Sequence, residues 1–493
     1  MSQLQESAGQ ALGEKAGPSL SEELPPPASH RALVVGAGLA GCEAAWQLAN
    51  RGVSVTLAEM KPQKYSPAHH SPGFAELVCS NSLKAARLGS AAGLLKEEMA
   101  RLGSLVVPCA RATAVAAGGA LAVDRDRFSA LVTEKIRAHP NIRVECREVI
   151  DPLAESGRWD ALLLASGPLT SDGLARSIRA ITGRDTLSFY DAAAPIVSLD
   201  SLRMDAVFYA ARYGRGEDDY INCPMDREQY ARFHAALVEA ESAPLKSFDR
   251  PDGSFAVYEG CMPIEVLAKR GEDAIRFGPL KPVGLRDPRT GHRPWAVVQL
   301  RRENAAGTLY NLVGFQTNLK FGEQKRVFSM IPGLEQAEFV RYGVMHRNTF
   351  LDSPQILLGG SRLKGSDKPL YFAGQITGVE GYIESAASGI LAGIQAWREL
   401  KGKEPLVLPQ TTMLGALMGY LSDAAVEKFQ PMGSNMGILP PMETADGRRI
   451  RDKQQRYELL ARRALDDLEG CISRSPADFL PFPPFPLSPD GSL

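Results

Sequence analysis

Three glycines and one glutamate near the start of the chain have the types and the spacing of a dinucleotide-binding turn. The glycines form the pattern G-x-G-x-x-G, and the glutamate follows 18 residues after the last of them. The first glycine suits a tight turn, the second lets the backbone approach a pyrophosphate, and the third lets a helix pack closely on a strand. An acidic side chain at this distance can accept a hydrogen bond from a ribose hydroxyl. The candidate cofactor-binding residues of this turn are Gly36, Ala37, Gly38, Leu39, Ala40, Gly41 and Glu59.

The elements around these residues make the pattern specific. Residues 33–35 are a short apolar run, residues 42–50 have a helical pattern, and residues 53–57 are a second apolar run. This order predicts strand, turn, helix and strand, with the N–H groups of the helix N-terminus facing the phosphates. The alternative is a glycine-rich turn in another kind of α/β unit. The pattern does not separate FAD from NAD(P).

A second unit late in the chain favours FAD. Residues 370–373 predict a strand, followed by a glycine turn and a long helix of small residues that ends near 400. In flavoproteins with this fold such a unit returns to the sheet, where its helix N-terminus stabilises negative charge on the reduced flavin. Gly374 and Gln375 are therefore further cofactor candidates. Tyr382, next to Gly381, can stack on a flavin or a substrate ring, or can belong to the core.

Two cysteines are candidates for thiol chemistry. Cys79 lies between an apolar pair and the polar residues 80–82, which can cap a helix, and Lys84 adds positive charge. Cys261 lies on a turn before a helix predicted at 264–269. A helix N-terminus acidifies a thiol, so both positions suit a reactive cysteine. The alternative for each is a small buried hydrophobe.

Composition limits the other possibilities. The seven cysteines are scattered without a C-x-x-C pair, which argues against a zinc ribbon or a disulfide framework and favours a reducing cytoplasm. The adjacent histidines 69 and 70 have no third ligand at a useful spacing, so we expect no metal. We also expect no membrane span, since no run of 18 apolar residues occurs.

The net charge is −1, so a nucleic acid would have to be met by local basic patches. Residues 269–302 hold nine basic and three acidic residues, and residues 447–463, which have a helical pattern, hold seven and two. The net charges of these segments are therefore +6 and +5. They are either solvated faces or polyanion-binding surfaces.

The chain predicts an α/β fold with a Rossmann-type dinucleotide-binding domain that is interrupted by an inserted α+β domain. The insertion has many short strand-like runs and one helix, at 226–239. The predicted divisions are a disordered tail at 1–30, the first part of the nucleotide-binding domain at 31–194, the insertion at 195–340, the second part with C-terminal helices at 341–470, and a Pro-rich tail at 471–493.

With these pieces in place, the chain resembles the folate- and FAD-dependent tRNA (uracil-54-C5)-methyltransferases, the TrmFO family. The matching stretches include GAGLAGCEAAWQLANRG (36–52), PAHHSPGFAELVCSNSLKA (67–85), EGCMPIEVLAKRG (259–271) and FAGQITGVEGYIESAASG (372–389). The resemblance covers roughly residues 31–440. Both tails look like additions to the family pattern.

The resemblance implies an enzyme that converts the T-loop uridine of tRNA to 5-methyluridine in the cytoplasm. Its carbon donor would be 5,10-methylenetetrahydrofolate and its reductant reduced FAD, supplied by NADPH or NADH, with no obligate protein partner. It implies two functional cysteines, which fall on Cys79 and Cys261. We predict Cys261 as the nucleophile that adds to uracil C6 and Cys79 as the base or assisting thiol. Cys223 is a third, lower-ranked candidate.

Three other functions stay open at this point. One is the related FAD-dependent family that modifies the wobble uridine with a partner GTPase, although its members are longer and have a large C-terminal helical region. Another is an FAD/NAD(P)H oxidoreductase for a small molecule, which would need no basic clusters. The last is a non-catalytic tRNA-binding factor, which would need neither a flavin nor a reactive thiol.

Overall fold

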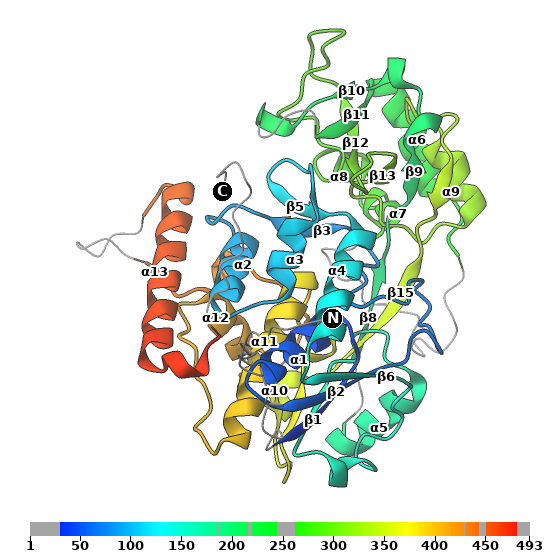
Figure 1. Cartoon of the computed structure of the whole chain (residues 1–493). Helices are drawn as coiled ribbons and strands as arrows, with labels where there is room; N and C mark the ends of the chain where they lie inside the picture. The colour runs from blue at the N-terminus through cyan, green and yellow to red at the C-terminus, as the bar shows by residue number, and fades with distance from the viewer. Residues whose placement is uncertain are drawn as a thin grey trace, which may run out of the picture.

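A seven-stranded sheet forms the base of the molecule (Figure 1). The computed structural model describes residues 30–184, 187–214, 219–243, 262–427, 429–442 and 450–480. The strands of this sheet are, in spatial order, β16 (Leu357–Leu358), β17 (Arg362–Leu363), β18 (Leu370–Phe372), β7 (Ala161–Leu164), β1 (Arg31–Val35), β2 (Ser54–Glu59) and β6 (Ile142–Cys146). Strands β18, β7, β1, β2 and β6 run parallel. Their continuous apolar runs form such a sheet because both of its faces are buried.

Helices cover both faces of this sheet. Alternate residues of β1 enter two different cores: Ala32 and Val34 belong to one, and Leu33 and Val35 to the other. The first core contains residues of α1 (Leu39–Ala49), α2 (Ala91–Arg101), α3 (Val106–Ala112), α4 (Arg125–Ala138) and α11 (Tyr382–Leu400), and the second contains residues of α5 (Asp172–Thr182). The predicted α/β class with a Rossmann-type parallel sheet is confirmed.

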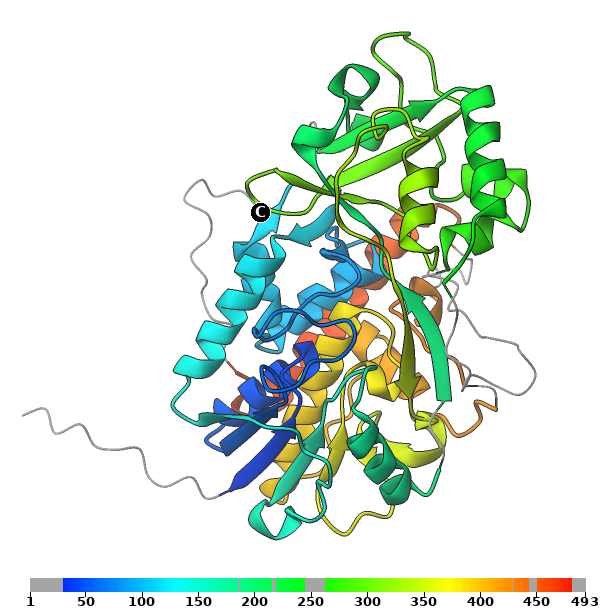
Figure 2. The same ribbon diagram turned by 90° about the vertical axis from the view of Figure 1, so that its right-hand side faces the viewer.

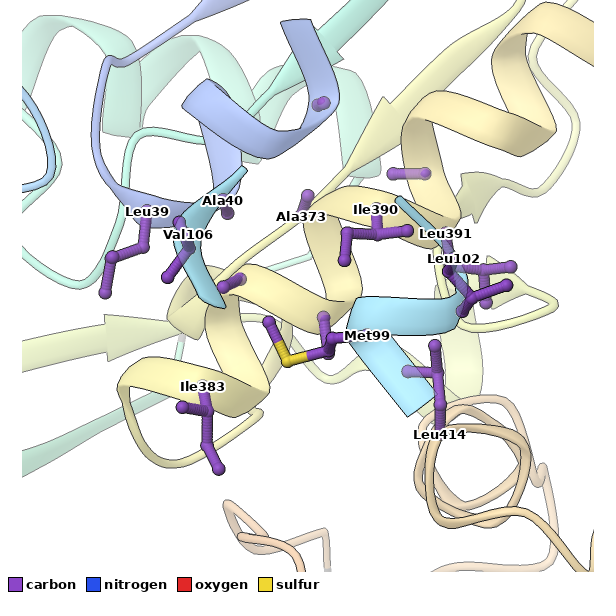
Figure 3. Packing of buried hydrophobic residues seen from close by; sticks show 14 of the residues in the cluster. Leu39, Ala40, Met99, Leu102, Val106, Ala373, Ile383, Ile390, Leu391 and Leu414 are labelled. Atoms are coloured by element: carbon purple, nitrogen blue, oxygen red, sulfur yellow. The ribbon is translucent and has the colours of Figure 1, made fainter. Parts of the chain in front are cut away.

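Helices α1 and α11 cross at very short range, although they are more than 300 residues apart in sequence. A Cβ atom added to Gly389 would lie 2.2 Å from the carbonyl oxygen of Ala40. Around this crossing, side chains of α1, α2, α11 and α12 (Met413–Tyr420) fill one cluster (Figure 3). The late strand–glycine–helix unit therefore packs directly on the first one.

A six-stranded antiparallel sheet lies above the first sheet in Figure 1. Its order is β10 (Phe208–Tyr209), β11 (Tyr220–Met225), β12 (Ala296–Arg302), β13 (Leu309–Leu312), β9 (Ile196–Ser198) and β14 (Phe339–Arg341). It has its own core, to which α6 (Arg227–Glu239) contributes. Besides α6, the helix predicted at 264–269 forms as α7 (Ile264–Ala268), and two helices that the sequence did not predict also form, α8 (Glu272–Arg276) and α9 (Phe321–Phe328). The last two are too short to show a clear 3.6-residue period in the sequence.

Two strands connect the sheets. Strands β8 (Leu187–Ala192) and β15 (Met345–Phe350) pair antiparallel along their length and run between the two parts of the molecule (Figure 2). The chain passes up one strand and returns down the other. This ribbon explains how a sheet formed by residues 196–341 is inserted into a nucleotide-binding fold.

Residues 80–82 do not cap a helix, so that prediction is wrong. They lead into β3 (Ser82–Ala85), which joins β5 (Ala120–Val123) and β4 (Ala114–Val115) in a small antiparallel sheet. The buried side chain of Asn81 donates to the carbonyl of Val123 at 3.0 Å. Asn81 is a residue type that can cap a helix. In this structure it holds a strand instead, because its hydrogen-bond partner, Val123, is 42 residues away in sequence.

The C-terminal part differs from expectation at both ends of its last helix, α13 (Lys453–Arg474). The helix predicted from 447 begins at Lys453, where Asp452 caps it. The Pro-rich tail predicted from 471 is folded as far as it is described: Asp478 is buried and forms ion pairs with Arg398 and Lys403. Residues 1–29 and 481–493 lie outside the described residues.

Among the described helices, α10 (Ser353–Ile356) is a further short one. In the described ranges no helix is both long and apolar enough to cross a bilayer.

Candidate active site

A cavity opens where β1, β2 and β7 end, and it brings together most of the residues singled out in the sequence. Gly36, Ala37, Gly38, Leu39, Ala40, Glu59, Cys79, Gly374, Gln375 and Tyr382 all line it. Ligands of open α/β sheets bind at the carboxyl ends of the strands, so this is the expected edge. Gly41 is the only predicted cofactor residue that does not line the cavity, and it has a packing role instead.

The three glycines of the first turn differ in what surrounds them. Gly36 has φ +100°, a conformation that L side chains rarely adopt, and its Cα faces the carbonyl of Ala165. A Cβ on Gly41 would lie 1.7 Å from the carbonyl oxygen of Gly36, so nothing larger than glycine fits there. A Cβ on Gly38 would meet no atom within 4 Å. The open space therefore lies at the start of α1, where an anionic group would bind.

Glu59 is held in a defined orientation at the end of β2. It is buried, its Oε2 accepts from the N–H of Ala37 at 2.7 Å, and its Oε1 accepts from the N–H of Lys61 at 3.0 Å. The carboxylate thus ties the glycine-rich turn to the second strand as well as facing the cavity. Its action on a ribose hydroxyl stays a prediction.

The late turn forms the wall beside α1. Gly374 has φ +84°, and its N–H donates to Ser388 Oγ at 2.7 Å. A Cβ at Gly374 would lie 2.9 Å from the Cβ of Ala40, so the two glycine turns leave no room for a side chain between them. Helix α11 then begins at Tyr382, after Gly381 with φ +120°. Two glycine-rich segments from opposite ends of the chain thus form one binding surface.

Cys79 lies on a loop against the start of α11. The Tyr382 hydroxyl oxygen accepts from the N–H of Cys79 at 2.7 Å and from the N–H of Ser80 at 3.4 Å, and it lies 2.9 Å from Cys79 Sγ. Burial, and then the nearby Cys79, raise the pKa of Tyr382 well above its usual value. The phenol is therefore neutral near pH 7. With both lone pairs engaged by N–H groups, its own proton is directed to the sulfur.

Three arginines surround the same loop. Arg125 donates to the carbonyl of Leu77 at 2.8 Å, and Arg341 donates to the carbonyl of Val78 at 2.6 Å. Arg301, on β12, donates to Ser80 Oγ at 2.8 Å and to Asn81 Oδ1 at 3.0 Å. Nearby cations stabilise a thiolate. Arg301 and Arg341 interact electrostatically with Cys79. These cations come from positions far apart in the sequence, whereas the sequence suggested a helix N-terminus and Lys84.

Lys84, which we expected to act on Cys79, is engaged elsewhere. Its Nζ donates to the buried carboxylate of Glu384 at 2.6 Å. Glu384 also accepts from the backbone N–H and the hydroxyl of Ser434. Lys84 therefore helps to fix the first turn of α11.

The other cysteines have different surroundings. Cys261 lies outside the described residues. Cys223, on β11, is buried in the core of the inserted sheet, and this burial raises its pKa. Burial also raises the pKa of Cys42 well above its usual value and that of Cys109 to about 12. Among the six cysteines in the described part of the chain, Cys79 is the one that lines the cavity.

Several cavity residues were not identified from the sequence. Arg147 directly follows β6, Ser166 and Thr170 follow β7, and Asn348 lies on β15. The Ser166 and Thr170 hydroxyls lie 2.7 Å apart. The first three follow strands of the parallel sheet, at the edge where ligands bind, so their positions after β6 and β7 are the signal that could have found them. Asn348 gave no such signal, since its strand pairs only with β8.

The histidine pair does not form a metal site with the surrounding described residues. His69 lines the cavity, its Nδ1 lies 2.6 Å from Ser66 Oγ, and burial lowers its pKa. No group of three or more His, Cys, Asp or Glu side chains that could hold a metal ion occurs in the described part of the chain.

The two basic segments also differ. In α13, Arg456 donates to the carbonyl of Ile450, and Arg463 donates to those of Pro440 and Pro441, so two of its arginines hold neighbouring loops. In residues 269–302, Lys269, Lys281, Arg286 and Arg293 are exposed. The segment 269–302 is therefore the better candidate for a polyanion-binding surface.

The cavity fits a flavin dinucleotide. The start of α1 has open space, its N-cap is a glycine without a side-chain cap, and a buried acidic group faces the cavity at the end of β2. The glycine turn before α11 continues this surface as far as Cys79 and Tyr382. The pyrophosphate would lie at Gly36–Ala40, the ribose at Glu59, and the ring system near Gly374, Gln375 and Tyr382.

Comparison with known proteins identifies the family. The model of the family described as glucose inhibited division protein A matches residues 31–404. A protein of Pelotomaculum thermopropionicum is 58% identical over 88% of this chain and 97% of its own length, and one of Heliobacterium modesticaldum is 56% identical over 90% and 98%. Both are named methylenetetrahydrofolate--tRNA-(uracil-5-)-methyltransferase TrmFO. The chain belongs to the TrmFO family.

The resemblance found in the sequence is therefore confirmed, and solved structures agree on the fold of this TrmFO chain. Aquifex aeolicus GidA in its form II crystal superposes with a TM-score of 0.62 at 16% identity, covering 91% of this chain and 76% of that one. The form I crystal gives 0.61 at 17% identity. At this identity the likeness shows the fold alone. The uncovered part of the TrmFO relatives is only two or three per cent of their length.

Proposed function

We propose that the chain methylates C5 of the T-loop uridine of tRNA, uridine 54, to give 5-methyluridine. The carbon would come from 5,10-methylenetetrahydrofolate, and the external reductant would be NADPH or NADH. One observation carries the proposal: the thiol of Cys79 lies in the wall of the cavity that the two glycine turns form. The names of the TrmFO relatives support the substrate, and the cytoplasm is where tRNA and reduced thiols occur together.

FAD would bind at Gly36–Ala40, Glu59, Gly374 and Gln375. When bound and reduced, it would supply the hydride that completes the methyl group. The chain's own task is then to hold the uracil and its bound carbon against this cavity and to move protons. The uridine of a folded tRNA would have to leave its stack to reach the cavity.

The reaction needs a thiol because uracil C5 is a weak nucleophile. A thiolate that adds to C6 turns the ring into an enolate, so that C5 can bond to the methylene carbon. A base then removes the C5 proton as the amine that carried the methylene leaves. Addition of a hydride to the exocyclic methylene that remains expels the thiolate from C6. We propose Cys261 as the nucleophile and Cys79 as the base or assisting thiol.

We propose Tyr382 as a positioning residue for Cys79, in place of the predicted stacking role. Its hydroxyl accepts the two loop N–H groups, and its proton is then available to the sulfur. A neutral phenol that donates to a thiolate holds the sulfur in one place and stabilises its negative charge. The carbonyl contacts of Arg125 and Arg341 also hold the same loop.

The assignment of Cys261 rests on the sequence, with indirect support from its described neighbours. The N–H of Ile264 donates to the carbonyl of Gln316 at 2.8 Å, and the N–H of Thr317 donates to that of Ala193 at 3.4 Å. Ala193 lines the cavity. The segment that follows Cys261 is thus anchored next to the cavity wall.

The experiment uses the purified protein with unmodified tRNA, labelled methylenetetrahydrofolate and NADPH. Label in 5-methyluridine at the T-loop is the expected result. Label at the anticodon would favour the wobble-uridine family instead. Oxidation of NADPH with no label in tRNA under any condition would overturn the proposal in favour of a small-molecule oxidoreductase.

Cys261→Ala should abolish tRNA methylation while FAD remains bound, because the nucleophile is lost and the cofactor contacts are not. Cys223→Ser is the matched control, since that thiol is buried in the inserted core and should affect stability but not the chemistry. The readouts are label in tRNA and the flavin absorbance of the purified protein. A fully active Cys261→Ala variant would remove the assignment.

A further inference from the structure

A second hollow lies on the inserted sheet, away from the glycine turns. Its lining includes Tyr213, Gly284, Arg286 and Arg293. Arg286 and Arg293 belong to the basic segment 269–302, and neither of them lines the proposed catalytic cavity. The hollow therefore combines an aromatic ring with two exposed guanidinium groups.

Tyr213 is presented as a platform. A Cβ added to Gly284 would lie 3.0 Å from each of three ring atoms of Tyr213, so the ring lies over the Gly284 backbone. The residue is 60% exposed. Its φ is +59°, a left-handed conformation that is unusual for an aromatic residue, and its N–H donates to the Gly284 carbonyl at 3.0 Å. An exposed aromatic ring held in such a conformation often has a role in binding.

The lining of the hollow is positively charged, because it includes Arg286 and Arg293 and no carboxylate. Asp287, next to Arg286 in sequence, is bound by Arg289 through contacts of 2.9 and 2.7 Å, which lower its pKa. Arg286 donates to the carbonyl of Gly291 at 3.3 Å, at the long end of the hydrogen-bond range, and keeps its charge at the surface. The two arginines of the hollow thus face solvent without a carboxylate among the hollow's lining residues.

The hollow is on the same sheet face as the contact to the Cys79 loop. Arg212, next to Tyr213, donates to Gln299 Oε1 at 2.7 Å. Gln299 and Arg301 are alternate residues of β12, so their side chains share one face and their Cα atoms are about 7 Å apart. Arg301 contacts Ser80 and Asn81. A polar row therefore runs from the hollow to the loop of the candidate catalytic thiol.

We infer that this hollow binds a nucleotide of the tRNA outside the modified uridine, with the base stacked on Tyr213 and its phosphates at Arg286 and Arg293. Aromatic stacking together with guanidinium contacts to phosphate is how proteins hold unpaired nucleotides. A bound polynucleotide that follows the polar row would reach the Cys79 loop. The inference rests on the proposed function, because it takes tRNA as the substrate.

The test measures the Kd of the full-length protein for unmodified tRNA over a range of salt concentrations. Tyr213→Ala should raise the Kd about ten-fold or more, and Tyr213→Phe should bind like the wild type, since it keeps the ring. The double variant Arg286→Gln, Arg293→Gln should also bind more weakly, and the slope of log Kd against log salt should fall by about 1.4 to 1.8. NADPH oxidation without tRNA should be unchanged in every variant.

Arg232→Gln is the matched control, because it removes an exposed arginine from α6, which packs on the opposite face of the same sheet. Wild-type affinity and salt slope in the Tyr213→Ala and double-arginine variants would overturn the inference. An equal loss in Arg232→Gln would also overturn it, since only general charge would then matter. If the wild-type protein itself bound no tRNA, the proposed function would be wrong, and the inferred role of the hollow would be wrong as a consequence.

Discussion

The cavity beside β1 and the outer face of the inserted sheet differ in the chemical groups that they present. Glycines at 36, 38 and 374 line the cavity and bring main-chain atoms to its surface. The inserted face presents long side chains, such as Tyr213, Arg286 and Arg293. A backbone surface has a fixed shape and suits one cofactor, whereas exposed arginines suit a large, flexible polyanion.

The Cys79 loop lies where these regions meet. Tyr382, from the nucleotide-binding part, contacts the sulfur, and Arg301, from the inserted sheet, contacts the next two residues. The candidate thiol is therefore positioned by both regions.

The largest effect is expected at Gly41. Gly41→Ala places a Cβ 1.7 Å from the Gly36 carbonyl oxygen, so the turn must move, and we expect a protein that is less stable and lacks FAD. Gly38→Ala meets no atom, so it should fold normally but bind FAD at least about ten-fold more weakly, because its methyl group points into the cavity. Flavin content and the melting temperature are the measurements.

Gly119→Ala is the control for both variants, since its added Cβ also meets no atom within 4 Å and it is remote from the cavity lining. It should keep its flavin. If Gly38→Ala also kept full FAD affinity, the pyrophosphate would not lie at this turn.

At the junction, Tyr382→Phe should lower tRNA methylation about ten-fold while FAD stays bound. The variant loses the hydroxyl that contacts the sulfur and both loop N–H groups, and a charge-assisted hydrogen bond contributes about 1.5 to 3 kcal/mol. The specific readout is the pH profile of iodoacetamide alkylation of Cys79 in a Cys261→Ala background. The profile should move to higher pH, because the thiolate is less stable.

Tyr371→Phe is the comparison, since it removes another buried hydroxyl, one that contacts Glu399. It should leave the Cys79 profile in place. A profile unaffected by Tyr382→Phe would show that the hydroxyl has only a structural role.

The last effect is on stability, not on the cofactor or the reaction, and it concerns Glu98, which is buried and accepts from the N–H groups of Met413 and Leu414 at the start of α12. Burial raises the pKa of Glu98 from 4.5 to about 8. Between these values the folded protein keeps a proton that the unfolded chain has released. The free energy of unfolding should therefore fall as the pH rises from about 5 to 8, by up to about 1.4 kcal/mol per unit.

Glu98→Gln cannot titrate, so its stability should not show this slope. The difference between the free energies of unfolding of the variant and the wild type should grow with pH over this window, as measured by urea denaturation at several pH values. Subtracting the wild-type free energy of unfolding from that of the variant removes the pH-dependent contributions of Glu43 and Lys96, whose pKa values are each about 7. Parallel curves for both proteins would show that Glu98 is ionised in the fold.

The sequence determined the parts of this protein that depend on local pattern. The glycine spacing at 36–41, the apolar runs of the parallel strands and the late glycine–helix unit predicted the sheet, its α/β class and one face of the cavity. These features can be read locally because each depends on residues within about 25 positions. The helices α8 and α9 of the insertion, and the strand at 82–85, could not be predicted in this way.

Only the tertiary structure decided which groups surround Cys79. The sequence suggested a helix N-terminus and Lys84, but the contacts come from Tyr382, Arg125, Arg301 and Arg341, and Lys84 pairs with Glu384. Tyr382 is 303 residues away in sequence from the thiol that it contacts. Such contacts follow from how α11 packs on α1 and how β8 and β15 place the inserted sheet. No local pattern encodes them, because they depend on the packing of elements distant in sequence.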